Sequence, residues 1–341
     1  MRKSILLCSL FIAINGFAQD VHFTQTTQTP LLINPAACGV LDGWERIIIN
    51  HRNQWLGAGT QFMTTNISAE ANIGKSRMND KAHLGLGILF YNDIGGDSRF
   101  GMQRGAVNLS GILPMGNGHS LSAGLQGAFV NRSYDLSRVT FNSQWDGENF
   151  DPTLLSGEGN SKNNFMYFEA AGGLFYSYDA GKNSFQRNND FKFQLGISGY
   201  NLNRPELRYA AGEGDRLYRK WVAHTSVVTD LGDSRMALDA SFAQFIQGPH
   251  LESLFGMMLR YRFEDGTKIT GNFQDAYFGA GLYYRLKDAI SPAIMVDWKG
   301  FRFGVSYDIT VSALRKAYRG GSLEFNFSYT NLSHALFKSR R

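Results

Sequence analysis

The sequence contains little of what anchors or cross-links many exported proteins. It has two cysteines and seven prolines in 341 residues, and no run reaches the roughly 18 apolar residues of a transmembrane helix. One of the two cysteines, Cys8, lies in the leader described below, so we expect no internal disulfide. An excess of one charge is also lacking, with 34 Lys and Arg against 29 Asp and Glu. This near balance gives no support for a nucleic-acid partner.

Residues 1–18 predict a secretory signal peptide. Arg2 and Lys3 precede an apolar run over residues 5–14, and Gly16-Phe17-Ala18 forms a small-x-small cleavage site. We therefore expect the chain to be exported.

Large apolar residues alternate with small or polar ones along most of the chain. In residues 301–310, for example, Phe301, Phe303 and Tyr307 point one way and Arg302 the other. A period of two is the pattern of a strand with one apolar and one polar face. It predicts about fourteen strands, near residues 44–55, 60–73, 82–92, 100–113, 119–132, 165–178, 190–201, 217–230, 235–246, 251–263, 275–286, 291–298, 301–310 and 321–331.

The strand lengths and connections favour a membrane barrel. Several strands reach ten or more residues, against the ~5–6 usual in soluble sheets. Most connections after even-numbered strands are short, such as 299–300, whereas 133–164 after the fifth strand is long. This parity is typical of outer-membrane barrels, with short periplasmic turns and long outer loops. We predict an all-β fold: an antiparallel barrel integral to the outer membrane, in which the last strand pairs with the first near Ile47 and Ile49. A soluble β-sandwich is the competing fold.

If the apolar faces of these strands meet lipid, the polar faces line the lumen. A charged side chain on the lipid face costs about 2–4 kcal/mol near the midplane. The residues then expected in the lumen are Lys192, Arg260, Arg262, Arg285, Lys287, Arg302, Asp308 and Glu324. They either fill the interior through mutual ion pairs or line a polar cavity that accepts a protein segment or a solute.

The N-terminal segment 19–43 does not alternate cleanly. Asn34-Pro35 favours a turn, and Gly39 can adopt a positive φ. The segment is either a flexible periplasmic leader or a plug within the barrel. The barrel itself then covers residues 44–331, and residues 332–341 form a basic tail.

Three separated blocks carry a family resemblance. They are "QDVHFTQ…LLINPAACG" followed by "HRNQW", then "LGLGILFYNDIGG" at 84–96, then "VSYDITVSALRKAYRGGSLEFNFSY" at 305–329. Together they resemble the PorP/SprF family of type IX secretion-associated outer-membrane proteins. The matching residues, expected to serve structure or partner docking, are Asn34, Pro35, Gly39, Arg52, Gln54, Trp55, Asn92, Asp93, Gly95, Ser306, Tyr307, Asp308, Gly320, Gly321 and Glu324.

The resemblance implies a non-enzymatic role in type IX secretion and, in gliding species, in gliding motility through the surface display of adhesins. The implied partners are the C-terminal domain of a secreted cargo or adhesin, and components of the secretion machinery. The alternative function is a passive pore or a transporter of small hydrophobic solutes, with residues 19–43 as a plug.

No pattern for catalysis, a cofactor or a metal stands out. The seven histidines are scattered without triad or metal-ligand spacing, so we expect no enzyme. Asp146, Glu148 and Asp151 in the longest connection are hard oxygen ligands that suit calcium. Their spacing does not match an EF-hand loop, and an ordinary solvated loop is the competing interpretation.

Overall fold

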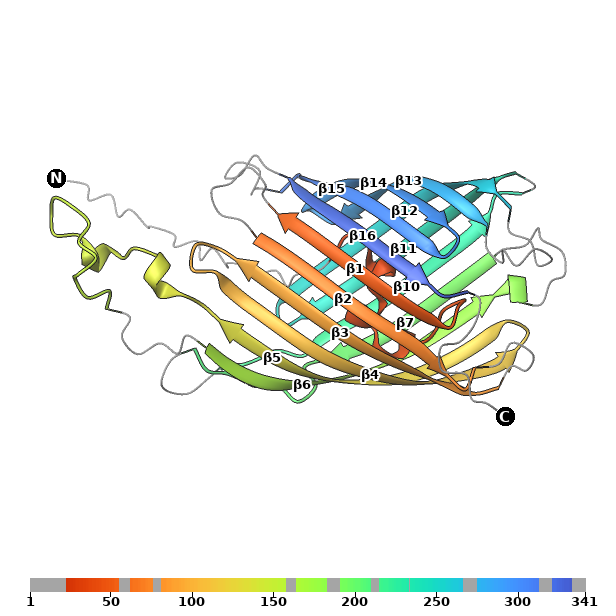
Figure 1. The fold of residues 1–341 in the computed structure, drawn as a ribbon, viewed down its shortest axis with the longest axis horizontal. Coiled ribbons are helices and arrows are strands. Elements are labelled where there is room, and N and C mark those ends of the chain that lie inside the picture. The colour runs from red at the N-terminus through yellow and green to blue at the C-terminus, as the bar shows by residue number, and fades with distance from the viewer. Residues whose placement is uncertain are drawn as a thin grey trace, which may run out of the picture.

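Fourteen strands close into one antiparallel barrel in the computed structural model of the chain (Figure 1). The structure describes residues 23–54, 62–75, 81–157, 164–182, 191–209, 215–232, 234–265, 275–312 and 321–332. Consecutive barrel strands pair with each other, and β1 closes the barrel against β16. The predicted fold class and strand number are confirmed. The predicted signal peptide, Trp55, Gly320 and the tail beyond residue 332 lie outside the described residues.

Each barrel strand lies within a few residues of its predicted position. The strands are β1 (Glu45–Gln54), β2 (Phe62–Ile73), β3 (His83–Gly95), β4 (Phe100–Gly116), β5 (His119–Ser133), β6 (Asn164–Asp179), β7 (Phe191–Tyr200), β10 (Lys220–Asp230), β11 (Met236–Gln247), β12 (His250–Glu264), β13 (Ala276–Arg285), β14 (Ala289–Trp298), β15 (Phe301–Thr310) and β16 (Ser322–Thr330). In the connection between β7 and β10, β8 (Glu206–Leu207) and β9 (Asp215–Arg216) form a separate two-stranded sheet.

The barrel closes in the predicted register. Ile47 of β1 lies opposite Tyr329 of β16, and Ile49 lies opposite Phe327. Pairing of the first strand with the last leaves no open edge, which a sheet in lipid requires because its backbone groups have no water to bond.

As predicted, the apolar residues of the alternating strands face outward and the polar residues face the lumen. Phe303 is 48% exposed on the outer face, whereas Asp308 on the same strand is 2% exposed and Glu324 on the next is 1% exposed. The expectation for Lys287 is wrong. β13 ends at Arg285, so Lys287 falls in the turn before β14, where it is exposed and has a φ of 62°.

The two ends of the barrel differ in their connections. At the turn end, two-residue hairpins at Asn117-Gly118 and Lys299-Gly300 have positive φ at both positions, which matches the twist of the flanking strands. The strand predicted at 100–113 continues to Gly116, because a register shift after Pro114 lets the pairing resume. The opposite end, here called the loop end, carries the long connections 134–163 and 201–219.

Residues 23–43, here called the lumen segment, lie inside the barrel (Figure 1). They contain three short helices: η1 (Thr26–Gln28), α1 (Pro30–Ile33) and η2 (Pro35–Ala37). Three further turns lie in connections: η3 (Leu136–Arg138), η4 (Asn142–Gln144) and η5 (Ala180–Lys182). In the part of the chain that the structure describes, no helix has the length and apolarity to span a membrane.

The apolar core is built largely around this segment. Phe23, Leu31 and Cys38 pack with Leu89 and Ala128 of the wall. A second cluster joins Ile33 of α1 to wall residues of β6, β7, β10 and β11, namely Ala171, Tyr200, Val222, Ala243 and Phe245. The segment is therefore an integral part of the interior packing.

Candidate functional site

The beginning of the lumen segment is held by a buried cluster of charges. Asp308 accepts hydrogen bonds from Arg52 at 2.8 Å and from Arg285 at 2.9 Å. The Thr24 hydroxyl donates to the same carboxylate at 3.0 Å, and Ser291 donates at 2.6 Å. Side chains from β1, β13, β14 and β15 thus meet beside Thr24. We call Arg52, Arg285 and Asp308, together with Glu324 of β16, the charge cluster.

Glu324 binds the backbone of the segment. Its two carboxylate oxygens accept the N–H groups of Thr24 at 2.8 Å and Gln25 at 3.2 Å. These donors directly precede the first turn, η1, where backbone N–H groups have no partner within a helix. A carboxylate from the barrel wall therefore caps the start of the segment. Each member of the charge cluster is at most 4% exposed, so its charges need ion-pair partners, and Arg285 also pairs with Asp288 at 2.7 Å.

Asn34 fixes the middle of the segment. Its side-chain oxygen accepts from the Ala36 N–H at 2.9 Å and caps η2, while Nδ2 donates to the Leu174 carbonyl at 3.0 Å. Nδ2 also lies 3.2 Å from Nε2 of His224 on β10. Glycine makes room for this side chain, because a Cβ on Gly196 would lie 2.5 Å from Nδ2.

The wall satisfies the carbonyl groups of the segment with small polar side chains. Ser122 donates to the Ala36 carbonyl at 2.6 Å, Ser110 to Cys38 at 2.6 Å and Ser198 to Ile33 at 2.5 Å. Gln126 donates to the Leu31 carbonyl at 3.2 Å. These residues come from β4, β5 and β7, so one side of the barrel wall hydrogen-bonds four carbonyl groups spread along the segment.

The segment leaves the lumen at the turn end. The Gly39 N–H donates to Glu70 at 2.7 Å, and Glu70 is paired with Arg46. Gly39 has a φ of 76°, and a Cβ there would lie 2.8 Å from the side-chain oxygen of Asn72, so both backbone conformation and space favour glycine. Lys192 lies at the rim, where its ammonium contacts Asp42 at 2.8 Å and Asp179 at 3.5 Å.

The other predicted lumen cations form a second group on β12 to β15. Arg260 and Arg302 both pair with Asp297, and Arg262 pairs with Asp230. Arg260 also lies over the Tyr277 ring, 4.2 Å from its centroid. These side chains fill the interior by mutual ion pairing, which was one of the two alternatives for the lumen charges.

The remaining motif residues lie near the loop end. Asp93 accepts from Thr64 at 2.7 Å, and Gly95 lies under the Phe62 ring. Tyr307 faces outward, and its hydroxyl accepts from the Gly321 N–H at 3.3 Å. Asn92 and Gln54 are half-buried in β3 and β1, and Ser306 is buried on the lumen face of β15.

The residues that sequence reasoning missed are the small wall residues and their polar partners. Inward positions occupied by Gly and Ser were interpreted only as part of the alternation. Their repetition on neighbouring strands was a usable signal, because small inward side chains leave room for a second layer of chain. The set is Glu70, Ser110, Ser122, Gly124, Gln126, Gly173, Gly196, Ser198 and His224.

The acidic residues of the long connection act as turn caps. Asp146 accepts the N–H groups of Glu148 at 2.8 Å and Asn149 at 2.6 Å. Asp151 accepts the N–H and the hydroxyl of Thr153. Among the described residues, no group of three His, Cys, Asp or Glu side chains could hold a metal ion.

Comparison with known proteins identifies a family. The model for "Type IX secretion system membrane protein PorP/SprF" matches residues 15–329. No curated protein matches the chain. Solved barrels resemble it weakly: the TodX monoaromatic hydrocarbon channel deltaS2 mutant has a TM-score of 0.42 at 10% identity, covering 89% of this chain and 94% of that chain. BamA from Haemophilus ducreyi, lacking POTRA domains 1-3, has 0.40 at 10% identity, covering 85% and 70%. No functional argument rests on these two likenesses.

Proposed function

Because the chain belongs to the PorP/SprF family of type IX secretion system membrane proteins, we propose that it is a non-enzymatic docking barrel. In this proposal it holds a secreted, adhesin-like protein at the cell surface and aids its export. The loop end faces outward and meets the C-terminal domain of that cargo. The turn end faces the periplasm and meets components of the secretion machinery.

The occupied lumen supports docking over conduction. The lumen segment bonds to β4, β5, β7, β15 and β16 and supplies much of the apolar core. A pore lined by the charge cluster would need this segment to leave, and its departure would unpair buried polar groups at several points. The two ends of the barrel are therefore the surfaces proposed to meet protein partners, with the loop end meeting the cargo.

The long connection after β5 carries the proposal. Trp145 is 57% exposed, Phe150 is 41% exposed and Leu155 is 89% exposed. Trp145 and Phe150 are held opposite each other by a β-bridge, so the exposed side chains stand on an ordered turn. Exposed apolar groups that gather on one projecting loop are typical of a binding surface, and Trp is a frequent anchor in such surfaces. This connection extends beyond the barrel (Figure 1).

The test uses a photo-crosslinking amino acid at position 155 in cells of the source organism. We expect a crosslink to one secreted surface protein, and loss of that protein from the surface when Trp145 and Leu155 are both changed to Ser. The control carries the crosslinker at Gly105, an outward position of β4. Normal display of all surface proteins in the double variant would contradict the proposal.

Planar-bilayer conductance separates docking from the alternative of a passive pore. A sealed docking barrel passes no steady ion current, whereas an open pore conducts in the wild-type form. Steady conductance by the wild-type chain would favour the pore.

A further inference from the structure

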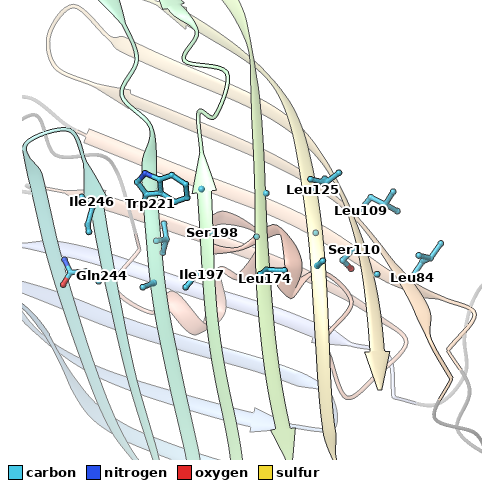
Figure 2. A pocket seen from close by; sticks show the side chains of 18 residues that line it. Leu84, Leu109, Ser110, Leu125, Leu174, Ile197, Ser198, Trp221, Gln244 and Ile246 are labelled. Atoms are coloured by element: carbon cyan, nitrogen blue, oxygen red, sulfur yellow. The ribbon is translucent and has the colours of Figure 1, made fainter. Parts of the chain in front are cut away.

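A groove of about 770 Å³ lies on the outward face of the barrel wall and extends from β3 to β11 (Figure 2). Its floor consists of small residues on five adjacent strands: Gly111, Ala123, Gly172, Gly199 and Ala223. The strand register places Gly111 opposite Ala123 and Gly172 opposite Gly199. Between the other neighbouring strands the small residues are offset by two positions, since Leu174 lies opposite Ala123 and Trp221 opposite Gly199.

Large apolar side chains border this floor. Leu109, Leu125 and Leu174 are 50%, 69% and 50% exposed, and Figure 2 shows them standing out from the strands. The groove therefore arises because small residues replace large ones at consecutive outward positions of an otherwise bulky apolar wall.

The groove crosses much of the membrane-facing height of the wall. At one end is Leu84, the second residue of β3, next to the turn end. At the other end is Trp221, the second residue of β10, next to the loop end. Because the strands of a barrel are tilted, a row of paired residues leads from one rim towards the other.

Along its length the groove offers hydrocarbon contact, with the Trp221 indole N–H at its loop end and one outward polar side chain, Gln244, in its wall. Gln244 is its outward polar residue, and its amide donates to the Glu252 carbonyl and accepts from the Ser253 hydroxyl, both at 2.7 Å. Ser110 and Ser198 point into the lumen, where they donate to the lumen segment. An acyl chain has no polar group to satisfy, whereas an extended peptide laid in this groove would leave its backbone unbonded.

A cation lies at the loop end of the groove. The Arg219 Nε–H donates to the Leu202 carbonyl at 3.3 Å. The Leu202 side chain covers the floor, since a Cβ on Gly199 would lie 3.0 Å from it. Trp221, two residues after Arg219, is the second residue of β10 and is 53% exposed. Trp and Arg side chains at the rim of an apolar surface are typical of the level at which lipid headgroups lie.

We propose that this groove is a binding site for an anionic, phosphate-bearing membrane lipid. The acyl chains of the lipid lie over the small-residue floor of the groove, and the phosphate of the lipid lies against Arg219. The volume is within the range of about 300–1,000 Å³ that ligand sites occupy. The positive charge at one end and the absence of polar groups along the floor match the two halves of such a lipid.

The test measures lipid retained by the purified full chain. The protein is placed in nanodiscs of equal parts phosphatidylglycerol and phosphatidylcholine, extracted in mild detergent and analysed by native mass spectrometry. We expect phosphatidylglycerol to be enriched about fivefold, as follows from the ~1 kcal/mol that one cation near the surface contributes. Equal retention of the two lipids would overturn the assignment of the phosphate.

Two glycines of β4 provide a matched pair of variants. Gly111 lies in the groove and Gly105 lies outside it, and an added Cβ meets nothing within 4 Å at either position. Gly111→Leu is expected to abolish retention, whereas Gly105→Leu retains lipid as the wild type does. Heat-modifiable migration on gels checks that both variants fold. Equal retention in the two variants would show that the floor does not hold the chains.

Arg219→Gln tests the headgroup contact separately. It is expected to keep the retained lipid but lose the preference for phosphatidylglycerol, while Arg208→Gln, in the same connection, keeps it. A membrane protein that copurifies without lipid and is displaced by Gly111→Leu would make the groove a protein interface and overturn the proposal.

Discussion

The two sides of the barrel fill one lumen in different ways. On β4 to β7 several inward residues are small, and the lumen segment lies against them through Ser122, Ser198 and Gly124. On β12 to β14 longer inward side chains meet one another, since Met258 packs with Tyr283 and Arg260 pairs with Asp297. The segment contacts this second side at its start, where Thr24 bonds to Asp308. A barrel of fixed strand number encloses a fixed interior, so residue size on each wall decides whether side chains or a second layer of chain occupies it.

The largest expected effect comes from breaking the charge cluster. Asp308→Asn removes the carboxylate that Arg52 and Arg285 share, although Arg285 keeps Asp288 at 2.7 Å. Removal of one partner from a buried ion pair costs about 3–5 kcal/mol. We expect this loss in guanidinium titrations of the folded barrel in detergent. Hydrogen exchange at the start of the lumen segment should rise as well.

Asp297→Asn is the control on β14, next to the strand that carries Asp308. It removes the partner of Arg260 and Arg302, and no hydrogen bond described here links it to the lumen segment. It should destabilise the barrel without faster exchange in residues 24–43. Equal exchange in both variants would show that the charge cluster does not hold the start of the lumen segment.

The next effect concerns the space that glycine leaves. A Cβ on Gly124 would lie 2.5 Å from the Ala36 nitrogen and the Pro35 oxygen, both of them backbone atoms. Gly124→Ala should therefore cost about 1–3 kcal/mol, as overpacking does, in the same titration. Gly279→Ala makes the same change on the other wall, where the nearest atom is the flexible Met258 sulfur at 2.8 Å. A loss in Gly279→Ala as large as that in Gly124→Ala would remove the distinction.

A smaller effect is expected from one hydroxyl group. Ser122→Ala removes the donor to the Ala36 carbonyl, which costs about 1 kcal/mol. Ser226→Ala is its control, since Ser226 donates to Gln194 of the wall. Only the first change should speed hydrogen exchange within the lumen segment. Unchanged exchange in Ser122→Ala would show that this bond does not hold the segment.

The smallest effect is a pH response in the exposed connection. Asp146 accepts two backbone N–H groups, as Glu324 does in the lumen, but it lies in water. These donors, from Asn149 and Glu148, lower the pKa of the Asp146 carboxyl below its ordinary value of 3.8. A lowered pKa in the folded turn means that its stabilisation is present above pH 3.8 and is lost as pH falls through the lowered pKa.

Limited proteolysis between pH 6 and pH 3 measures this response. The connection should resist cleavage at pH 5 and lose resistance only below pH 3.8. Asp146→Asn should show a smaller loss, because Asp135 and Asp151 cap other turns of the same connection and their pKa values are lowered as well. Loss of resistance already at pH 5 would contradict the proposal that the ionised Asp146 carboxylate stabilises the turn.

The strands were predictable because alternation is local. Phe303 and Arg302 differ in polarity whatever the rest of the chain does, and closure in lipid then forces β1 to pair with β16. The charge cluster was only half predictable. Asp308 and Glu324 were expected in the lumen and Arg52 was identified by its motif, but their meeting at Thr24 depends on four strands closing around one point.

The period of two in the sequence was enough to predict the strands, their approximate number and which face of each is apolar. Strand length and connection parity favoured a barrel over a sandwich. Only the tertiary structure decided that residues 23–43 lie within the lumen, where α1 and η2 meet Ser122, Ser198 and Gly124. The same holds for the outward groove, since the strand register brings Gly111 opposite Ala123 and Gly172 opposite Gly199. A small residue in the sequence does not indicate what occupies the space beside it, because its neighbours on other strands and in the lumen are set by closure of the barrel.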